Sequence, residues 1–106
     1  MIDIESLRKL NRPEQIAITE HARQRLLERG IAVSDIVRCI AKGEIIKQYE
    51  DDKPFPSCLI LGMAANDSYI HVVVSHDDEF IYLITAYYPD TEVWEADFKT
   101  RKERSK

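Results

Sequence analysis

The sequence predicts an α+β domain in which N-terminal helices pack on one face of an antiparallel β-meander of about four strands, followed by a C-terminal helix. Two patterns predict this fold class. Apolar residues recur at helical spacing up to residue 42, and from residue 44 they form β-rich runs separated by short polar turns. Helices outside an uninterrupted run of strands are typical of an α+β domain.

The helical part begins with a segment whose apolar residues lie at roughly helical spacing: Ile2, Ile4, Leu7 and Leu10. Turn residues end it at 11–15, and residues 16–18 form a short extended lead-in. Thr19 is a favourable N-cap for a helix over 20–29, and Gly30 stands where a left-handed C-cap is expected.

The buried face of this helix is expected to hold Ala22, Leu26 and Leu27. A second helix follows after a tight turn, with Ser34 as its N-cap and Gly43 at its end. These two short helices are expected to pack on the sheet that the rest of the chain forms.

The β-rich part contains four expected strands, at residues 44–50, 57–64, 69–76 and 80–88. Short turns join them, except for an acidic, proline-marked loop after the first. In the last strand, Thr85 and Tyr87 are expected to share a face with Ile81 and Leu83. Residues 91–102 have apolar residues at spacings that predict the C-terminal helix, docked by Trp94.

A length of 106 residues, with 44% hydrophobic and 32% charged residues, is sufficient for one globular domain over 1–106. Within it we expect an N-terminal helical extension (1–15), a core (16–98) and a basic tail (99–106). Residues 31–98 carry 4 basic and 13 acidic side chains, whereas the tail carries 5 and 1. The acidic middle argues against strong non-specific nucleic-acid binding but allows a local cationic site for RNA.

No apolar run approaches the roughly 18 residues of a membrane span, so no membrane partner is expected and the protein is placed in the cytoplasm. Cys39 and Cys58 follow no ligand or redox spacing and are expected to be buried free thiols. No cofactor or metal is indicated, because the cluster at 76–79 has no known ligand spacing and a charged turn explains it.

One stripe of charged side chains on the first capped helix is a candidate site. His21, Arg25 and Arg29 follow one another at steps of about 40° along the boundary between the buried and exposed faces, over about 12 Å. Side chains at this boundary reach toward the margin of a sheet. The alternative is a solvated stripe with weak ion pairs to Glu20 and Glu28.

Several separated motifs resemble one bacterial family. They are TEHARQRLLERGI, DDKPFPSCLILG, HVVV and ITAYYPD, spread over residues 18–98, and the family they resemble is domain of unknown function 4258. That family is grouped by fold with metal-independent ribonucleases and toxins of the barnase, colicin E5/D and RelE-like kind. The resemblance implies helices on an antiparallel sheet and, by analogy, ribonuclease activity. The family-like positions are His21, Arg25, Arg29, Gly30, Thr85 and Tyr87.

These residue types suit cleavage of RNA by attack of the RNA's own 2′-hydroxyl on the adjacent phosphate. His21 would take the proton, Arg25 and Arg29 would stabilise charge on phosphorus, and Tyr87 would orient or donate. His71 and Thr85 are further candidates for substrate binding, although the simpler interpretations are a semi-exposed His71 and a Tyr87 that packs in the strand. If the site is real, these side chains converge on one groove.

The competing hypothesis is a non-catalytic module of the same fold that binds a protein partner. The acidic middle and the incomplete catalytic signature favour the module, whereas the stripe and the resemblance favour the nuclease. A nuclease of this kind would in turn have a neutralising or regulatory protein partner.

Overall fold

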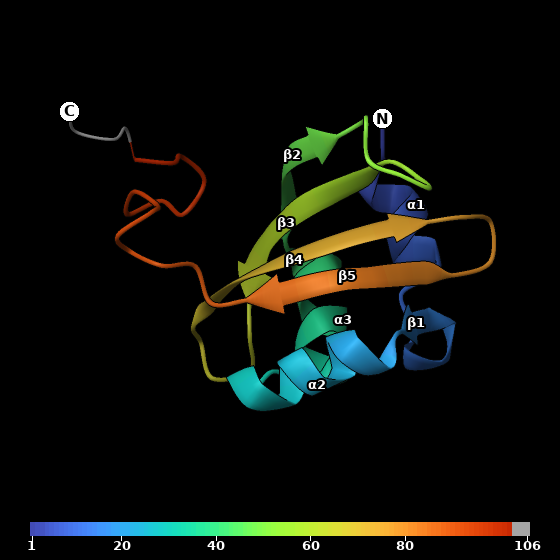
Figure 1. Cartoon of the computed structure of the whole chain (residues 1–106), viewed down its shortest axis with the longest axis horizontal. Helices are drawn as coiled ribbons and strands as arrows, with labels where there is room; N and C mark the ends of the chain where they lie inside the picture. The colour runs from blue at the N-terminus through green and yellow to red at the C-terminus, as the bar shows by residue number, and fades with distance from the viewer. Residues whose placement is uncertain (103–106) are drawn as a thin grey trace.

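The computed structural model describes residues 1–102 and has three helices and a five-stranded sheet (Figure 1). The helices are α1 (Ile4–Lys9), α2 (Glu20–Arg29) and α3 (Val33–Lys42), and a 3-10 turn, η1 (Pro13–Gln15), precedes the first strand. The strands are β1 (Ile16–Ile18), β2 (Glu44–Tyr49), β3 (Ser57–Met63), β4 (Tyr69–His76) and β5 (Ile81–Tyr87). The α+β class is confirmed.

The strands lie in the order β1-β5-β4-β3-β2. From β2 to β5 each strand pairs antiparallel with the next, which confirms the predicted meander. The prediction of four wholly antiparallel strands was wrong, because the expected lead-in is a fifth strand, β1, which runs parallel to β5 with Ile16 opposite Ile81. Three residues are too few to show a strand period, so this pairing depends on the edge that β5 offers.

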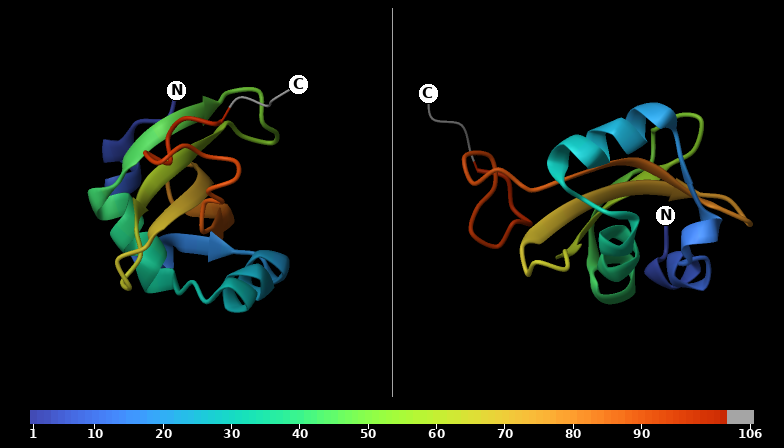
Figure 2. Two further views of the ribbon diagram at one scale, coloured as in Figure 1. Left: turned by 90° about the vertical axis from the view of Figure 1, so that its left-hand side faces the viewer. Right: turned by 90° about the horizontal axis from the view of Figure 1, so that it is seen from below.

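Helices α1 and α3 cover one face of the sheet, and α2 runs alongside β5 (Figure 2). Apolar side chains from all three helices join one core with this face, among them Leu7, Leu26, Ile36 and Ile40. Gly62 permits the close approach of α3 to β3, because a Cβ there would lie 2.6 Å from the Cys39 sulfur. None of the described helices is long and apolar enough to span a membrane.

The ends of α2 are as predicted. The Thr19 hydroxyl accepts a hydrogen bond from the Ala22 amide at 3.1 Å, and Gly30 is left-handed with φ 69°. The expected burial of Leu27 was wrong, since this side chain is 70% exposed. It lies about 100° around the helix from Leu26, beyond the part that packs on the core.

The start of α3 also differs from the prediction. The helix begins at Val33, so Ser34 is inside it and is not the N-cap. The orphan amide of Ala32 is instead bound by the Asp35 carboxylate at 2.8 Å. A first-turn acid thus satisfies the helix end that the serine was expected to cap.

The predicted C-terminal helix is absent from the described chain. Residues 89–102, here called the C-terminal loop, fold back as a short hairpin in which Lys102 N–H binds the Val93 carbonyl at 2.8 Å. Asp97 caps a turn through the Lys99 amide, and Phe98 has φ 56°. Turn-forming aspartates and docking of the loop on the sheet outweigh the helical spacing of its apolar residues. Residues 103–106 of the predicted basic tail lie outside the described chain.

A β-bulge assigns the residues of β5 to the two faces of the sheet. Val73 lies opposite Thr85 while Val74 lies opposite Leu83, so Ile84 is the extra residue. Ile81 and Leu83 therefore join the helix-covered core, and Thr85 and Tyr87 lie on the other face, here called the open face. The predicted common face for these four residues was wrong, because strict alternation does not survive a bulge.

Candidate functional site

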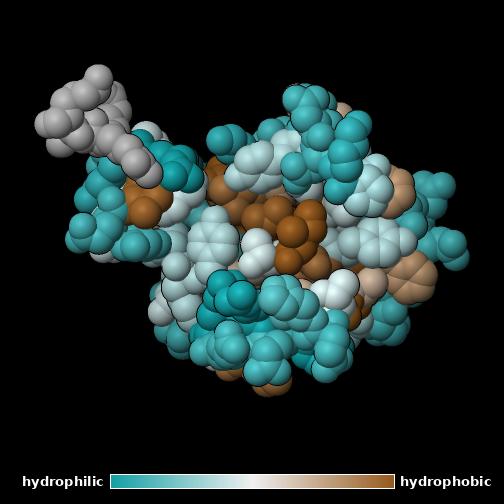
Figure 3. Space-filling model, viewed as in Figure 1, coloured by the Kyte–Doolittle hydropathy of each residue, from teal (hydrophilic) through white to brown (hydrophobic). Residues whose placement is uncertain are grey.

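The open face of the sheet carries a small apolar cluster under the C-terminal loop. Leu59, Val73 and Trp94 are its buried members, with Tyr49 and Phe98 packed against them. The space-filling view of this side shows hydrophobic residues at the centre of the molecule, bordered by hydrophilic ones (Figure 3). The open face is thus an apolar surface with a polar rim.

A histidine and a tyrosine are hydrogen-bonded on this face. His71 in β4 lies directly opposite Tyr87 in β5, and its Nδ1 is 3.3 Å from the tyrosine hydroxyl. Its Nε2 is 2.8 Å from the Phe98 carbonyl of the C-terminal loop. A carbonyl only accepts, so in the neutral imidazole Nε2 carries the hydrogen and Nδ1 accepts from the Tyr87 hydroxyl.

Burial shapes the protonation of both partners. Desolvation lowers the pKa of His71, which is fully buried, although the Phe98 hydrogen bond acts in the opposite direction. Desolvation raises the pKa of Tyr87, and the positive charges of Arg101 and Arg29 partly offset that rise. At neutral pH the pair is therefore a neutral imidazole that accepts a hydrogen bond from a neutral phenol.

Two arginines lie close enough to this pair for their charges to act on Tyr87. The Arg29 guanidinium, at the end of α2, donates to Thr85 Oγ1 at 3.2 Å and to the Ala86 carbonyl at 2.8 Å. Arg101, from the C-terminal loop, lies 5.5 Å from the centre of the Trp94 ring. Both bonds of Arg29 use one nitrogen, which leaves donors of its fork for a ligand.

The six predicted site residues are only partly brought together. His71 contacts Tyr87 and Arg29 contacts Thr85, as convergence on one groove requires. His21 and Arg25 are exposed on α2, two turns and one turn before Arg29 respectively, and make no side-chain hydrogen bond or ion pair within residues 1–102. The stripe therefore reaches the sheet at its C-terminal end alone.

Sequence reasoning missed three contributors to this face, Tyr49, Phe98 and Arg101. Phe98 and Arg101 were missed because a helix over 91–102 was predicted, and such a helix gives no reason for either residue to fold back over β4. The aspartates at 90 and 97, each of which binds amides just after it, were the available signal.

A comparison with protein-family models matches residues 18–88 to one family, described as Domain of unknown function (DUF4258). The chain belongs to this family. The match covers both arginines and the histidine of the α2 stripe, together with His71 and Tyr87, whereas Trp94, Phe98 and Arg101 lie beyond it. Comparison with curated proteins and with solved structures finds no match for this chain.

The aromatic residues of this DUF4258 chain are unevenly distributed. The chain has five tyrosines, three phenylalanines and one tryptophan, and none of them joins the core between the helices and the sheet. Tyr49, Trp94 and Phe98 belong to the open-face cluster, and Tyr87 lies beside them. The aromatic residues of this cluster therefore pack under the C-terminal loop, on the face of the sheet opposite the helices.

The candidate metal ligands do not assemble. Within residues 1–102 no three His, Cys, Asp or Glu side chains form a group that would hold a metal ion. Asp77 binds the amides of its own turn and the Tyr82 hydroxyl instead. Cys39 and Cys58 are buried free thiols, and burial raises the pKa of each to about 12, which disfavours the thiolate needed for chemistry.

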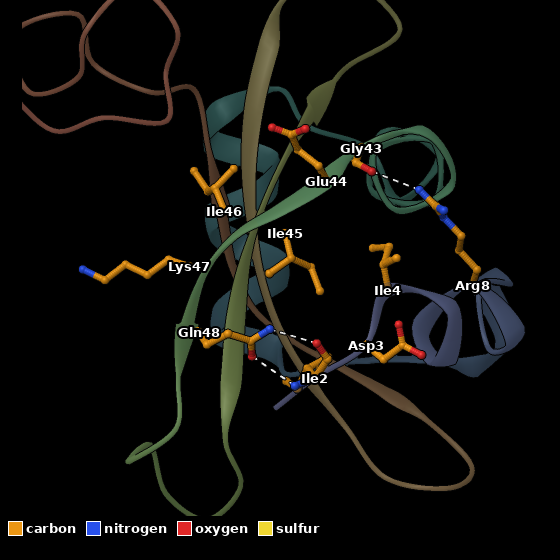
Figure 4. Close-up of a pocket in the computed structure, with 10 residues that line it drawn as sticks. All are labelled: Ile2, Asp3, Ile4, Arg8, Gly43, Glu44, Ile45, Ile46, Lys47 and Gln48. Carbon is orange, nitrogen blue, oxygen red and sulfur yellow. Dashed lines mark hydrogen bonds between the residues drawn. The ribbon is translucent and has the colours of Figure 1, made fainter.

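A groove between the N-terminal segment and β2 is a structural junction rather than a site (Figure 4). Gln48 exchanges two hydrogen bonds with the backbone of Ile2, at 2.8 and 3.0 Å. Arg8 donates to the carbonyls of Ile40 and Gly43, at 3.0 and 2.9 Å, at the end of α3. These polar groups already have partners, so they fasten α1 to the domain.

Proposed function

We propose that this protein is a metal-independent ribonuclease that cleaves RNA on the open face of its sheet. The observation that supports this most is the hydrogen-bonded pair of Tyr87 and His71, flanked by Arg29 and Arg101. A proton-transfer pair beside two cations is what attack of a 2′-hydroxyl on its own phosphate requires. The cytoplasm, where free thiols persist, is the proposed compartment.

The direction of the hydrogen bond assigns a role to Tyr87. Its hydroxyl hydrogen is directed to His71, so the lone pairs of its oxygen face outward and accept the proton of the 2′-hydroxyl. As that proton moves to Tyr87, the tyrosine's own proton moves to His71 Nδ1. The 2′-oxygen bonds to phosphorus and the bond from phosphorus to the 5′-oxygen breaks, giving a 2′,3′-cyclic phosphate and a 5′-hydroxyl.

The remaining predicted residues complete the proposal. Arg29 and Arg25 stabilise the extra negative charge on the phosphoryl oxygens, because a planar guanidinium binds two oxygens at once. Thr85 fixes Arg29 through the bond at 3.2 Å. Solvent water supplies the proton that the leaving 5′-oxygen takes up, and His21, eight residues before Arg29 on α2, contacts the RNA outside the reacting phosphate. Tyr87 thus takes the proton-accepting role that the sequence analysis gave to His21.

The test is cleavage of a mixed RNA pool by the purified protein, with the products examined for cyclic phosphate ends. We expect Tyr87→Phe to lower the cleavage rate by at least about 100-fold, the usual contribution of one positioned proton-transfer group. Tyr88→Phe is the matched control, since this neighbour is exposed and its hydroxyl accepts a hydrogen bond from the Asn66 amide at 3.5 Å, away from the His71 pair. A chelator is expected to leave the rate unchanged.

The outcomes separate the proposal from its competitor. Cyclic phosphate ends that disappear in Tyr87→Phe and persist in Tyr88→Phe support the nuclease. Absence of cleavage, or equal rates in both variants, contradicts it. In that case we favour a non-catalytic module that binds a protein. Ile84 is 47% exposed on β5, beyond the end of β1, and offers a partner an apolar contact there.

The nuclease proposal carries two further expectations. We infer a fold relationship with ribonucleases of the barnase, colicin E5/D and RelE-like kind, which share helices on an antiparallel sheet. We also infer a protein partner that neutralises or regulates the activity, because uncontrolled RNA cleavage harms the cell that makes it. Co-purification of a protein that blocks cleavage when added back would identify such a partner.

A further inference from the structure

A second groove, of about 610 Å³, lies at the end of the sheet where β4 begins. Its walls come from the C-terminal end of α3, from β2 and β3, and from the C-terminal loop. Leu61, Met63 and Tyr69 contribute apolar surface, and the basic side chains are those of Arg38, Lys42 and Lys99. An apolar floor with cations at its margin distinguishes this groove from the junction at the N-terminal segment.

Two of the three cations in this groove have no charged or hydrogen-bonded side-chain partner among residues 1–102. Glu44 binds Lys99, with 2.5 Å between carboxylate oxygen and Nζ, and Asp97 accepts hydrogen bonds from amides of its own turn. The acids that line the groove are therefore engaged. Arg38 and Lys42 make no ion pair or side-chain hydrogen bond with the residues that the structure describes, and their spacing puts them on one side of α3.

The groove also has an aromatic wall that continues to the proposed cleavage site. Tyr69 is 45% exposed, and the Phe98 ring lies against it with 5.2 Å between the ring centres. The Phe98 carbonyl holds His71, which lies two residues beyond Tyr69 on the same face of β4. The groove and the Tyr87–His71 pair thus lie on either side of a single residue, Phe98.

We infer that this groove binds a nucleotide next to the scissile one in a single strand of RNA, with its base stacked on Tyr69 and its phosphate held by Arg38 and Lys42. This inference rests on the proposed function, whose substrate class it narrows. Stacking on an exposed aromatic ring requires an unpaired base, so a duplex is excluded from the groove. The guanidinium of Arg38 and the ammonium of Lys42 supply the positive charge that binds the phosphate.

The experiment measures binding without cleavage. A labelled single-stranded 2′-O-methyl RNA, which lacks the attacking hydroxyl, is titrated with the full chain at several salt concentrations. We expect the double variant R38E/K42E and the single variant Tyr69→Leu each to weaken binding about ten-fold or more. Loss of the contact with this phosphate is expected to reduce the slope of log affinity against log salt by about 0.7 in the double variant.

Matched controls are Arg23→Glu, which reverses an exposed α2 charge outside the groove, and Tyr88→Leu, which removes an exposed aromatic ring outside it. Both are expected to bind like the unaltered protein, and melting curves confirm that every variant is folded. Equal binding by the groove variants and their controls would overturn the inference, as would equal affinity for duplex RNA. Weakened binding without any RNA cleavage by the unaltered protein would keep this inference and overturn the proposed nuclease.

Discussion

Gly30 ends α2 in a conformation that other residues adopt at a cost. Its φ is 69°, and a Cβ built there meets no atom within 4 Å, so the penalty is one of backbone conformation and not of space. We expect Gly30→Ala to lower the free energy of unfolding by about 1 kcal/mol, measured by urea denaturation. Gly30→Asn is expected to cost less, because Asn tolerates the left-handed region. An unchanged stability in Gly30→Ala would contradict this account.

His71 makes the stability of the domain depend on pH. Its pKa in the folded state is lowered by burial from the ordinary value of 6.5, and Tyr87, Trp94 and the Phe98 carbonyl surround the ring. Below pH 6.5 the imidazole is therefore protonated in the unfolded chain but remains neutral in the folded chain. The contribution of His71 to the free energy of unfolding is complete above this pH and is lost as the pH falls through the folded pKa.

We expect the melting temperature to fall between pH 7.5 and pH 5.5, and His71→Gln to reduce that fall. His21→Gln, which alters an exposed histidine, is expected to keep the dependence of the unaltered protein. A His71→Gln variant with the same pH dependence as the unaltered chain would show that another group is responsible.

Residue-scale predictions from the sequence succeeded where the determinant is local. The caps at Thr19 and Gly30 depend on the few residues around them, and both were predicted correctly. The pairing of His71 with Tyr87 depends on strand register and a bulge at Ile84, which no local pattern reveals. Both residues could be proposed as candidates, but their hydrogen bond could not.

At the scale of elements, Asp35 joins α3 to a distant turn. One carboxylate oxygen accepts from the Ala32 amide and the other from the Ala65 amide, each at 2.8 Å. We expect Asp35→Ala to cost about 2 kcal/mol in unfolding free energy, since two amides lose a charged acceptor. Ser34→Ala, at the position where the sequence predicted the cap, is expected to change stability little; equal losses in both variants would contradict this role.

The sequence predicts elements well when their pattern is long and their partner is next in the chain. The strands of the meander and the two capped helices meet that condition. Strand β1 does not meet it, because its partner β5 is distant in sequence. Ile16 pairs with Ile81, 65 residues further along the chain. The C-terminal loop does not either, since contacts of Trp94 with His71 decide its path.

At the scale of the whole molecule, the topology gathers several arginines toward one end of the sheet. The turns after β2 and β4 lie at one end of the sheet and carry Asp51, Asp52 and the acidic run 77–79. Helices α2 and α3 and the C-terminal loop bring Arg29, Arg38 and Arg101 toward the other end, where the loop also carries acidic residues. A chain with net charge −4 can therefore present a local cationic surface.

The C-terminal loop is expected to unfold together with the rest of the domain. Trp94 is the one tryptophan of the chain, 6% exposed, with its ring centre 4.6 Å from that of His71 in the middle of β4. Its fluorescence therefore reports docking of the loop, whereas far-ultraviolet circular dichroism reports the helices and strands. Because the loop covers a fully buried residue of the sheet, we expect both signals to change at the same urea concentration. A fluorescence midpoint at a lower urea concentration would show that the loop leaves the sheet while the domain stays folded. The fold would then not require the Phe98 contact with His71.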